Sequence, residues 1–219
     1  MNRRSYNAIA PQWDAARSSF RGRESAYLDA LLEGLPAGAE VLDLGCGTGR
    51  PIAEAILARG HRVTGVDQAE ALLDLARTRL PGGAWIHGTI EDFAPRRRYD
   101  AVVCWDALFH LDRSAHRPLL TRFAAWLRPG GRLMVSFGGS DHPAFTDTMF
   151  GETFFYDSHP PATVLDMLAA LHFEPMVSEF VNLPTPGRDK GRYAVVARLA
   201  GRGTGGAREP ASRGAARRD

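Results

Sequence analysis

Residues 41–49, Val-Leu-Asp-Leu-Gly-Cys-Gly-Thr-Gly, decide the fold class of this chain. The mostly apolar residues 41–44 run directly into glycines at every second position. This pattern predicts a buried strand followed by a glycine-rich loop. Pro51 and the apolar stripe behind it predict a helix that ends at Gly60. A strand, a glycine-rich turn and a helix are typical of the first unit of a nucleotide-binding α/β fold.

The same alternation continues on the carboxy-terminal side of this unit. Strands separated by helices form βαβ units, which predicts an α/β fold with a parallel sheet. The connection between the last two strands is too short for a crossover helix, so we expect them to pair antiparallel. The expected strands are 61–66, 84–87, 99–105, 132–137, 176–181 and 193–198, and the expected helices are 69–80, a helix capped by Ser114, and 161–171.

Three segments depart from this rhythm and predict the domain organisation. Residues 1–34 contain four aromatic residues and an amphipathic run, which predicts a helical cap over the main domain, 35–200. Residues 138–160 mix aromatic with acidic and histidine residues and predict a substrate loop. Residues 201–219 are rich in Arg and Gly and contain no large apolar residue, which predicts a disordered tail.

Composition restricts the class of protein. The chain has 219 residues, of which 44% are hydrophobic and 24% charged, as is usual for a globular chain. Apolar runs fall short of the roughly 20 residues that span a bilayer, and the first residues lack the apolar stretch of a secretory signal. Cys46 and Cys104 have neither a disulfide framework nor metal-ligand spacing. We therefore expect a cytoplasmic protein with no membrane partner and two buried free thiols.

Charge argues against a nucleic-acid partner. The net charge is +2, but residues 200–219 hold five arginines against two acids, which leaves 22 basic and 23 acidic residues in 1–199. A slightly acidic domain offers no basic stripe for phosphates. We expect a small-molecule substrate and no nucleic acid, and the sequence leaves the oligomeric state open.

The spacing of the glycines separates the classes of nucleotide site. A dinucleotide fingerprint places its third glycine where this chain has Arg50. A Gly-Lys-Ser/Thr triplet, which a P-loop requires, is also missing from this stretch. The pattern therefore disfavours NAD, FAD and ATP. Asp67 ends the next strand, where an acid can bind ribose hydroxyls or simply cap the following helix.

Five segments occur in a characteristic order, namely Val41–Gly49, Gly65–Asp67, Gly88–Phe93, Tyr99–Val103 and Leu127–Leu133. Together they resemble the motifs of class I S-adenosylmethionine-dependent methyltransferases, and Tyr6–Asp14 resembles the family's first helix. The resemblance implies a Rossmann-like, seven-stranded mixed sheet with helices on both faces, an antiparallel C-terminal hairpin and an N-terminal helical cap. It also implies S-adenosylmethionine as cofactor and S-adenosylhomocysteine as product. We expect no metal, because His142, His159 and the nearby acids have no metal-ligand spacing.

The resemblance further implies a set of cofactor-binding residues. Asp43 corresponds to the acid near the methionine amino group, Asp67 to the acid on the ribose, and Gln68 to a residue beside the adenine. Thr89 stands where the family has an acid for the adenine amino group, which weakens that contact. The expected cofactor residues are Tyr6, Trp13, Arg21, Asp43, Gly45, Cys46, Gly47, Gly49, Asp67, Gln68, Thr89, Ile90, Glu91 and Trp105.

The candidate catalytic residues are His110, Asp106 and Tyr156. Residues that follow the strand 99–105 lie at the carboxyl edge of the sheet, where open α/β folds bind ligands. A histidine there suits general-base catalysis, although a structural histidine with both ring nitrogens bonded is the alternative. The substrate candidates from the loop are His142, Glu152, Phe154, Asp157 and His159, whereas its aromatic residues can also simply anchor the loop on the core.

The expected function is transfer of a methyl group from S-adenosylmethionine to a small-molecule acceptor by in-line displacement. Two alternatives remain open at this point. One is a S-adenosylmethionine-binding enzyme that cyclises or cleaves the cofactor itself, and the other is a binding module without chemistry. The acceptor atom, whether O, N, S or C, does not follow from the sequence.

Overall fold

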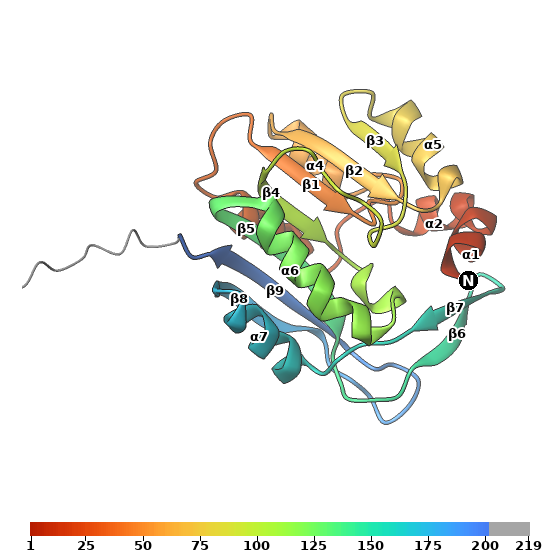
Figure 1. Cartoon of the computed structure of the whole chain (residues 1–219). Helices are drawn as coiled ribbons and strands as arrows, with labels where there is room; N and C mark the ends of the chain where they lie inside the picture. The colour runs from red at the N-terminus through yellow and green to blue at the C-terminus, as the bar shows by residue number, and fades with distance from the viewer. Residues whose placement is uncertain (202–219) are drawn as a thin grey trace, which may run out of the picture.

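Seven strands form one mixed sheet in the order β3-β2-β1-β4-β5-β9-β8 in the computed structural model, which describes residues 1–201 (Figure 1). Strands β1 to β5 pair parallel, and β9 pairs antiparallel with both β5 and β8. The predicted fold class and the antiparallel C-terminal hairpin are therefore confirmed. Residues 202–219, nearly all of the predicted tail, lie outside the described residues. The strands are β1 (Glu40–Leu44), β2 (Arg62–Asp67), β3 (Ala84–His87), β4 (Tyr99–Cys104), β5 (Leu127–Gly138), β8 (Phe173–Asn182) and β9 (Arg192–Leu199).

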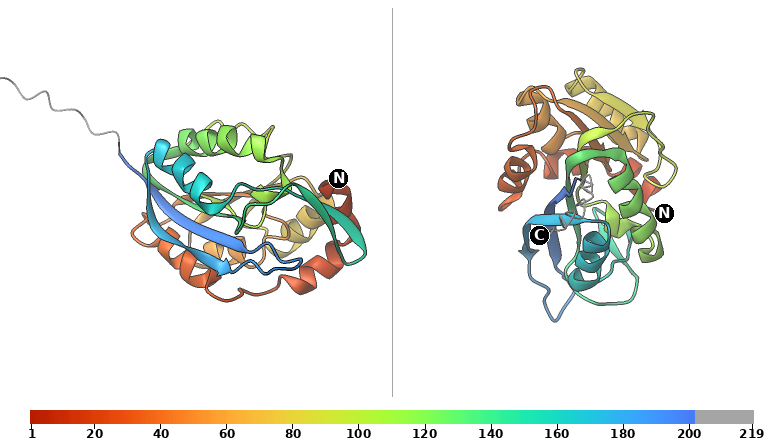
Figure 2. Two further views of the ribbon diagram at one scale, coloured as in Figure 1. Left: turned by 90° about the horizontal axis from the view of Figure 1, so that it is seen from below. Right: turned by 60° about the vertical axis from the view of Figure 1, so that its left-hand side comes forward.

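Helices cover both faces of the sheet because alternate residues of each strand point to opposite sides. Val102 and Cys104 of β4 face a core that includes α6 (His116–Trp126) and α7 (Pro161–Ala170). Ala101 and Val103 face a second core with α3 (Glu24–Leu32) and α4 (Ile52–Ala58). The left view of Figure 2 shows the sheet between these two helical layers. Helix α5 (Glu70–Arg79) packs on β2 and β3.

The turn after β1 requires glycine. Gly45 and Gly47 have φ values of 74° and 54°, in the left-handed region that favours glycine. A Cβ on Gly45 would also lie 2.5 Å from the Cβ of Ala107. The backbone N–H groups of Gly45 and Cys46 both donate to the carbonyl of Val66, so the turn is tied to the end of β2.

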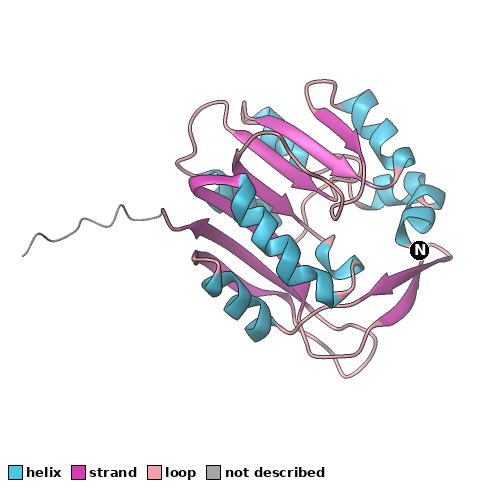
Figure 3. Ribbon diagram, in the orientation of Figure 1, coloured by secondary structure: helices cyan, strands magenta, loops and turns pink. Residues whose placement is uncertain are grey.

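The segment 138–160 is more regular than the expected loop. It contains a hairpin of β6 (Phe145–Met149) and β7 (Glu152–Tyr156), separate from the main sheet (Figure 3). Phe150 and Gly151 connect the strands with φ values of 52° and 85°, as a two-residue hairpin turn of type I′ requires. The expected cap at Ser114 is wrong, because Asp112 accepts the N–H of Ser114 in a 3₁₀ turn (Arg113–Ala115) and α6 begins only at His116.

The N-terminal helices α1 (Asn2–Ala8) and α2 (Ala10–Ala16) lie at the carboxyl ends of the strands, next to the hairpin (Figure 1). Asn2 donates to the carbonyl of Phe155 at 2.9 Å and accepts its N–H at 2.8 Å, and the Ser5 hydroxyl donates to the carbonyl of Thr153 at 2.6 Å. These bonds hold α1 against β7. The residues of the predicted cap therefore lie in two places. Helix α3 packs on one face of the sheet, whereas α1 and α2 lie at the carboxyl ends of the strands.

Two sequence expectations concern the whole described part of the chain. Cys46 and Cys104 are both buried and free. Within residues 1–201, the structure contains no helix that is both long and apolar enough to traverse a membrane.

One buried histidine predicts how stability depends on pH. His116 is fully buried at the start of α6, and its Nε2–H donates to the carbonyl of Leu108 at 3.0 Å. Burial, and next the neighbouring His159, lower the pKa of His116 from 6.5 to about 4. The unfolded chain therefore binds a proton at this side chain between those pH values and the folded chain does not, so stability falls as pH falls through this window.

We predict that His116→Leu reduces this pH dependence. Between pH 7 and pH 5 the free energy of unfolding of the variant should fall by about 2 kcal/mol less than that of the unmodified protein. Urea unfolding at both pH values measures the difference. Equal losses in the two proteins would contradict the assignment.

Candidate active site

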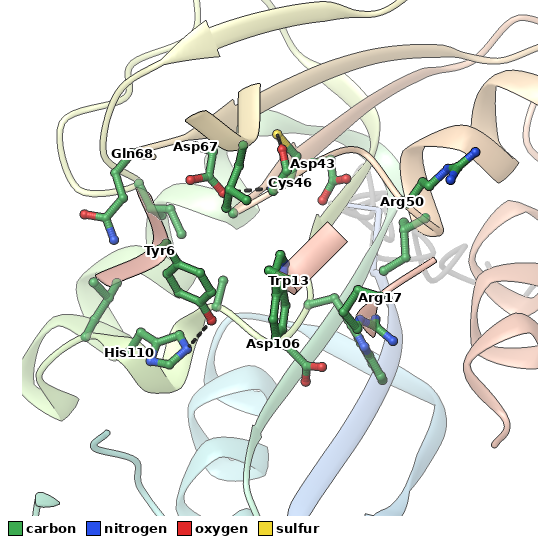
Figure 4. Close-up of a pocket in the computed structure, with 18 of the residues that line it drawn as sticks. Tyr6, Trp13, Arg17, Asp43, Cys46, Arg50, Asp67, Gln68, Asp106 and His110 are labelled. Atoms are coloured by element: carbon green, nitrogen blue, oxygen red, sulfur yellow. Dashed lines mark hydrogen bonds between the residues drawn. The ribbon is translucent and has the colours of Figure 1, made fainter. Parts of the chain in front are cut away.

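A cavity lies at the carboxyl ends of β1, β2 and β4. The order of the strands reverses between β1 and β4, and open α/β sheets bind ligands at such a switch point. We call it the loop cavity, because residues of the glycine loop line it. Figure 4 shows side chains that line this cavity. Its lining residues are Tyr6, Trp13, Arg17, Asp43, Gly45, Cys46, Gly47, Arg50, Ile52, Asp67, Gln68, Leu72, Ile90, Glu91, Trp105, Asp106, Ala107, His110 and Leu111.

Asp67 supports the glycine loop and also faces the cavity. Its Oδ2 accepts the N–H of Gly47 and its Oδ1 accepts the N–H of Ala69, both at 2.8 Å. The side chain therefore bonds the start of α5, as the capping alternative expected, and still lines the loop cavity. Burial raises the pKa of Asp67, while the backbone N–H groups oppose that rise. Each carboxylate oxygen keeps a lone pair for a further donor.

Asp43 is a buried carboxyl group for which the described part of the chain provides no hydrogen-bond donor. Its exposed fraction is 3%, and it lines the same cavity as Asp67. Burial and the nearby Asp67 carboxylate raise the pKa of Asp43 to about 7. A cationic ligand beside Asp43 would favour its ionised form and reverse this rise. The floor of the cavity is therefore suited to a ligand that carries both a positive charge and hydroxyl groups.

Arg17, a residue that the sequence interpretation missed, also lines the loop cavity. It is 5% exposed and pairs with the fully buried Glu24 at 2.9 Å. Trp105 Nε1–H also donates to Glu24, at 3.3 Å, which connects the Arg17–Glu24 pair to the end of β4. The expected Arg21 is exposed instead and donates to the carbonyl of Ala16. Two arginines four residues apart were equivalent by local pattern, and only the burial of Glu24 distinguishes them.

His110 has both ring nitrogens engaged. Its Nδ1 lies 3.0 Å from the carbonyl of Phe155, so this nitrogen carries the hydrogen. The hydroxyl of Tyr6 then donates to Nε2 at 2.9 Å, the bond drawn in Figure 4. Burial lowers the pKa of His110 to about 4. In this arrangement His110 is a neutral side chain that joins α1 to the hairpin, and it has no free nitrogen to accept a proton.

Asp106 occupies a strained position two residues after the end of β4. Its φ of 51° is unusual for a residue other than glycine, and such strain concentrates at functional sites. The Asp106 N–H donates to the Ser136 hydroxyl at 2.7 Å, and that hydroxyl donates to Oδ1 at 3.1 Å. Arg192 Nη1 donates to Oδ2 at 2.7 Å. These bonds hold the carboxylate in one orientation between β4 and β9.

A second cavity of about 360 Å³ lies beside the hairpin, and we call it the hairpin cavity. It adjoins the loop cavity through two contacts: Asp106 pairs with Arg192, and the rings of His110 and Tyr156 lie 4.8 Å apart. In each pair the first residue lines the loop cavity and the second lines the hairpin cavity. The lining residues are Phe109, Gly138, His142, Phe145, Asp147, Tyr156, Asp157, Ser158, Arg188, Asp189, Lys190, Gly191 and Arg192.

Several predicted residues lie outside both cavities. Gly49 packs under Leu80 and Trp85, and Thr89 bonds Asp92. Among the substrate candidates only His142 and Asp157, with Tyr156, line the hairpin cavity. Phe154 is fully buried against Tyr6, Glu152 pairs with Met149 beside the hairpin turn, and His159 bonds the carbonyl of Arg113. Across residues 1–201, His, Cys, Asp and Glu side chains form no group that could hold a metal ion.

Comparisons with known proteins agree with this geometry. Residues 41–131 match a family model described as a methyltransferase domain. The chain is 30% identical over 172 residues to the ubiquinone biosynthesis O-methyltransferase of Marinobacter nauticus, a match that covers 72% of this chain and 70% of the relative. It is 34% identical over 144 residues to the protein of the same name from Xanthomonas axonopodis pv. citri, covering 63% of this chain and 58% of that relative.

A solved structure extends the similarity to nearly the whole fold. The 1,6-didemethyltoxoflavin-N1-methyltransferase of Burkholderia thailandensis superimposes with a TM-score of 0.60 at 27% identity, over 88% of each chain. The family model, the Marinobacter relative and this fold all agree with the five sequence motifs. The chain belongs to the class I S-adenosylmethionine-dependent methyltransferase family.

Proposed function

We propose that this chain transfers the methyl group of S-adenosylmethionine to a small molecule held in the hairpin cavity. One observation carries the proposal. A cavity whose side chains suit the cofactor and a separate second cavity meet at Asp106 and His110, just past β4. The Burkholderia relative contains S-adenosylhomocysteine and its acceptor together, which supports a two-ligand arrangement. With the charge balance described above, we propose a small-molecule acceptor rather than nucleic acid, and a cytoplasmic location.

The residues of the loop cavity fit S-adenosylmethionine. Asp67 offers a buried carboxylate for the ribose hydroxyls, and the unpartnered Asp43 suits the positively charged methionine end. The glycine loop lets the backbone approach the ligand, since Gly47 has no side chain between it and Trp13. Ile90 offers an apolar surface to the adenine, and Arg17 offers a guanidinium to the methionine carboxylate.

The cofactor, when bound, supplies a methyl group on a positively charged sulfur, which is an excellent leaving group. This chain then has to align the acceptor with that methyl group and exclude water from both. Tyr6 and Trp13 cover the loop cavity, and the Tyr6–His110 bond holds that cover on the hairpin. Asp106, fixed by Ser136 and Arg192, orients the group of the acceptor that faces the methyl. His110 has a positioning role in this scheme.

Product analysis distinguishes this function from its alternatives. Methyl transfer converts S-adenosylmethionine into S-adenosylhomocysteine only when an acceptor is present. Cleavage of the cofactor by cyclisation gives methylthioadenosine without an acceptor, and a binding module gives neither product. The size of the hairpin cavity favours methyl transfer, because a cofactor-cleaving enzyme needs no second site. Methylthioadenosine as the main product in a chromatographic assay would overturn the proposal.

We predict that Asp67→Ala weakens binding of S-adenosylhomocysteine by about tenfold or more, because charge-assisted hydrogen bonds to the ribose are lost. Asp74→Ala is the matched control, since Asp74 lies exposed on the adjacent helix α5. Calorimetric titration measures both affinities, and thermal unfolding checks that both variants fold. An Asp67→Ala affinity equal to that of the control would refute the ribose role.

A second prediction tests whether Arg17 or Arg21 binds the cofactor. The double variant Arg17→Met with Glu24→Gln removes the buried pair together, so no uncompensated charge remains. It should lower the affinity for S-adenosylhomocysteine by about tenfold, whereas Arg21→Met should leave the affinity unchanged, because Arg21 lies outside the cavity. The same titration decides between them, and a loss confined to Arg21→Met would reverse the assignment.

A further inference from the structure

The hairpin cavity combines aromatic walls with uncompensated hydrogen-bond donors. We propose that the acceptor is a flat aromatic molecule with an anionic group, a carboxylate or a ring oxyanion, and that Lys190 binds this group. The inference rests on the proposed function, since it describes the acceptor of that reaction. It specifies a class of substrate that family membership alone leaves open.

Aromatic rings form the apolar side of the cavity. Phe145 of β6 stacks on Tyr156 of β7, with ring centroids 5.2 Å apart and planes inclined by 17°. Phe109 lies 6.1 Å from Tyr156, and His142 lies 5.1 Å from Phe145. A cavity of about 360 Å³ lies in the range that holds small drug-sized ligands. Walls of this kind favour a flat aromatic ligand, which can stack on them or meet them edge to face.

The acidic side chains of the cavity are all engaged. Asp147 pairs with Arg188, and Asp157 accepts both the N–H and Nε–H of Arg113. Asp189 accepts the amide of Asn182 with both oxygens and the N–H of Gly191 as well. The negative charges are therefore already neutralised or hydrogen-bonded within the protein, and they offer little to a cationic acceptor.

Three hydrogen-bond donors of the same cavity remain available. Lys190 Nζ has one partner in the described part of the chain, the carbonyl of Gly187 at 3.3 Å, and this long bond leaves its charge uncompensated. Arg192 uses Nη1 for Asp106 and Nε for Asn182, which leaves the Nη2 hydrogens free. The Tyr156 hydroxyl adds a third donor without a partner among residues 1–201. Three donors, two of them cationic, match the oxygens of an anion.

Lys190 is also chemically distinct within this chain. It is the only lysine in the sequence, whereas arginine supplies the other 26 basic residues. An amine-reactive ester can therefore modify one side chain, Lys190, besides the terminal amine of Met1. Lysine presents a compact charge on a flexible stem, which can follow an anionic group that differs in position from one acceptor to another.

Calorimetric titration of the S-adenosylhomocysteine-loaded protein with two probes tests the proposal. The probes are 2-naphthoate and 2-naphthamide, which share ring and shape but differ in charge. We expect 2-naphthoate to bind at least about tenfold more tightly than 2-naphthamide, the effect of one charge-assisted hydrogen bond. Lys190→Met should abolish the preference and Lys190→Arg should restore most of it. Arg198→Met is the matched control, because Arg198 lies on β9 and pairs with Glu174 away from the cavity.

Protection of the lysine provides an independent measurement. Mass spectrometry of peptides from the protein, digested after treatment with an acetylating ester, should show slower modification of Lys190 with 2-naphthoate than with 2-naphthamide. Equal affinities of the two probes, no binding of either, or an unchanged preference in Lys190→Met would each overturn the proposal. A separate titration of the unloaded protein with S-adenosylhomocysteine, together with the product analysis, separates this failure from failure of the proposed function. That failure would appear as loss of cofactor binding or as methylthioadenosine as the main product.

Discussion

The turn between β1 and α4 is the constraint on which the site depends. Positive φ values at Gly45 and Gly47, with bonds from the turn to Val66 and Asp67, hold the backbone in one conformation at the end of β2. The same turn brings the carboxyl groups of Asp43 and Asp67 into one buried cavity. Burial and the Asp67 carboxylate both raise the pKa of Asp43, and a cationic ligand beside Asp43 would favour its ionised form.

The N-terminal helix connects this site to the acceptor side. Asn2 and Ser5 bond the backbone of β7, while Tyr6 of the same helix covers the loop cavity and bonds His110. Any movement that lifts α1 from the sheet edge must therefore break contacts with the hairpin as well. The same helix thus covers the loop cavity and is bonded to strand β7, which borders the hairpin cavity.

Helices and strands could be predicted where burial gives their sequence a simple hydrophobic pattern. Strand β4 faces a helical layer on each side and reads as a continuous apolar run, which the sequence shows plainly. The β6–β7 hairpin was not predictable in this way, because only Phe154 on it is fully buried and neither strand joins the main sheet. The half-buried positions of β6 hold Phe145, Asp147 and Met149, so no uniformly apolar face marks this strand in the sequence. Arg17 and Arg21 are similarly indistinguishable by local pattern, and the buried Glu24 alone decides between them.

The sequence by itself determined the order of the strands of the main sheet and of the helices between them, the glycine turn and the position of Asp67, because local periodicity and turn chemistry specify these features. Tertiary structure decided which distant side chains meet. Tyr6 bonds His110 across 104 positions, and Asp106 pairs with Arg192 across 86. Those contacts depend on β9 lying next to β5 and on α1 crossing the sheet edge. No local pattern encodes a partner that far along the chain, so the loss of His110 as a free base and the placement of Lys190 in the hairpin cavity emerge only from the packed fold.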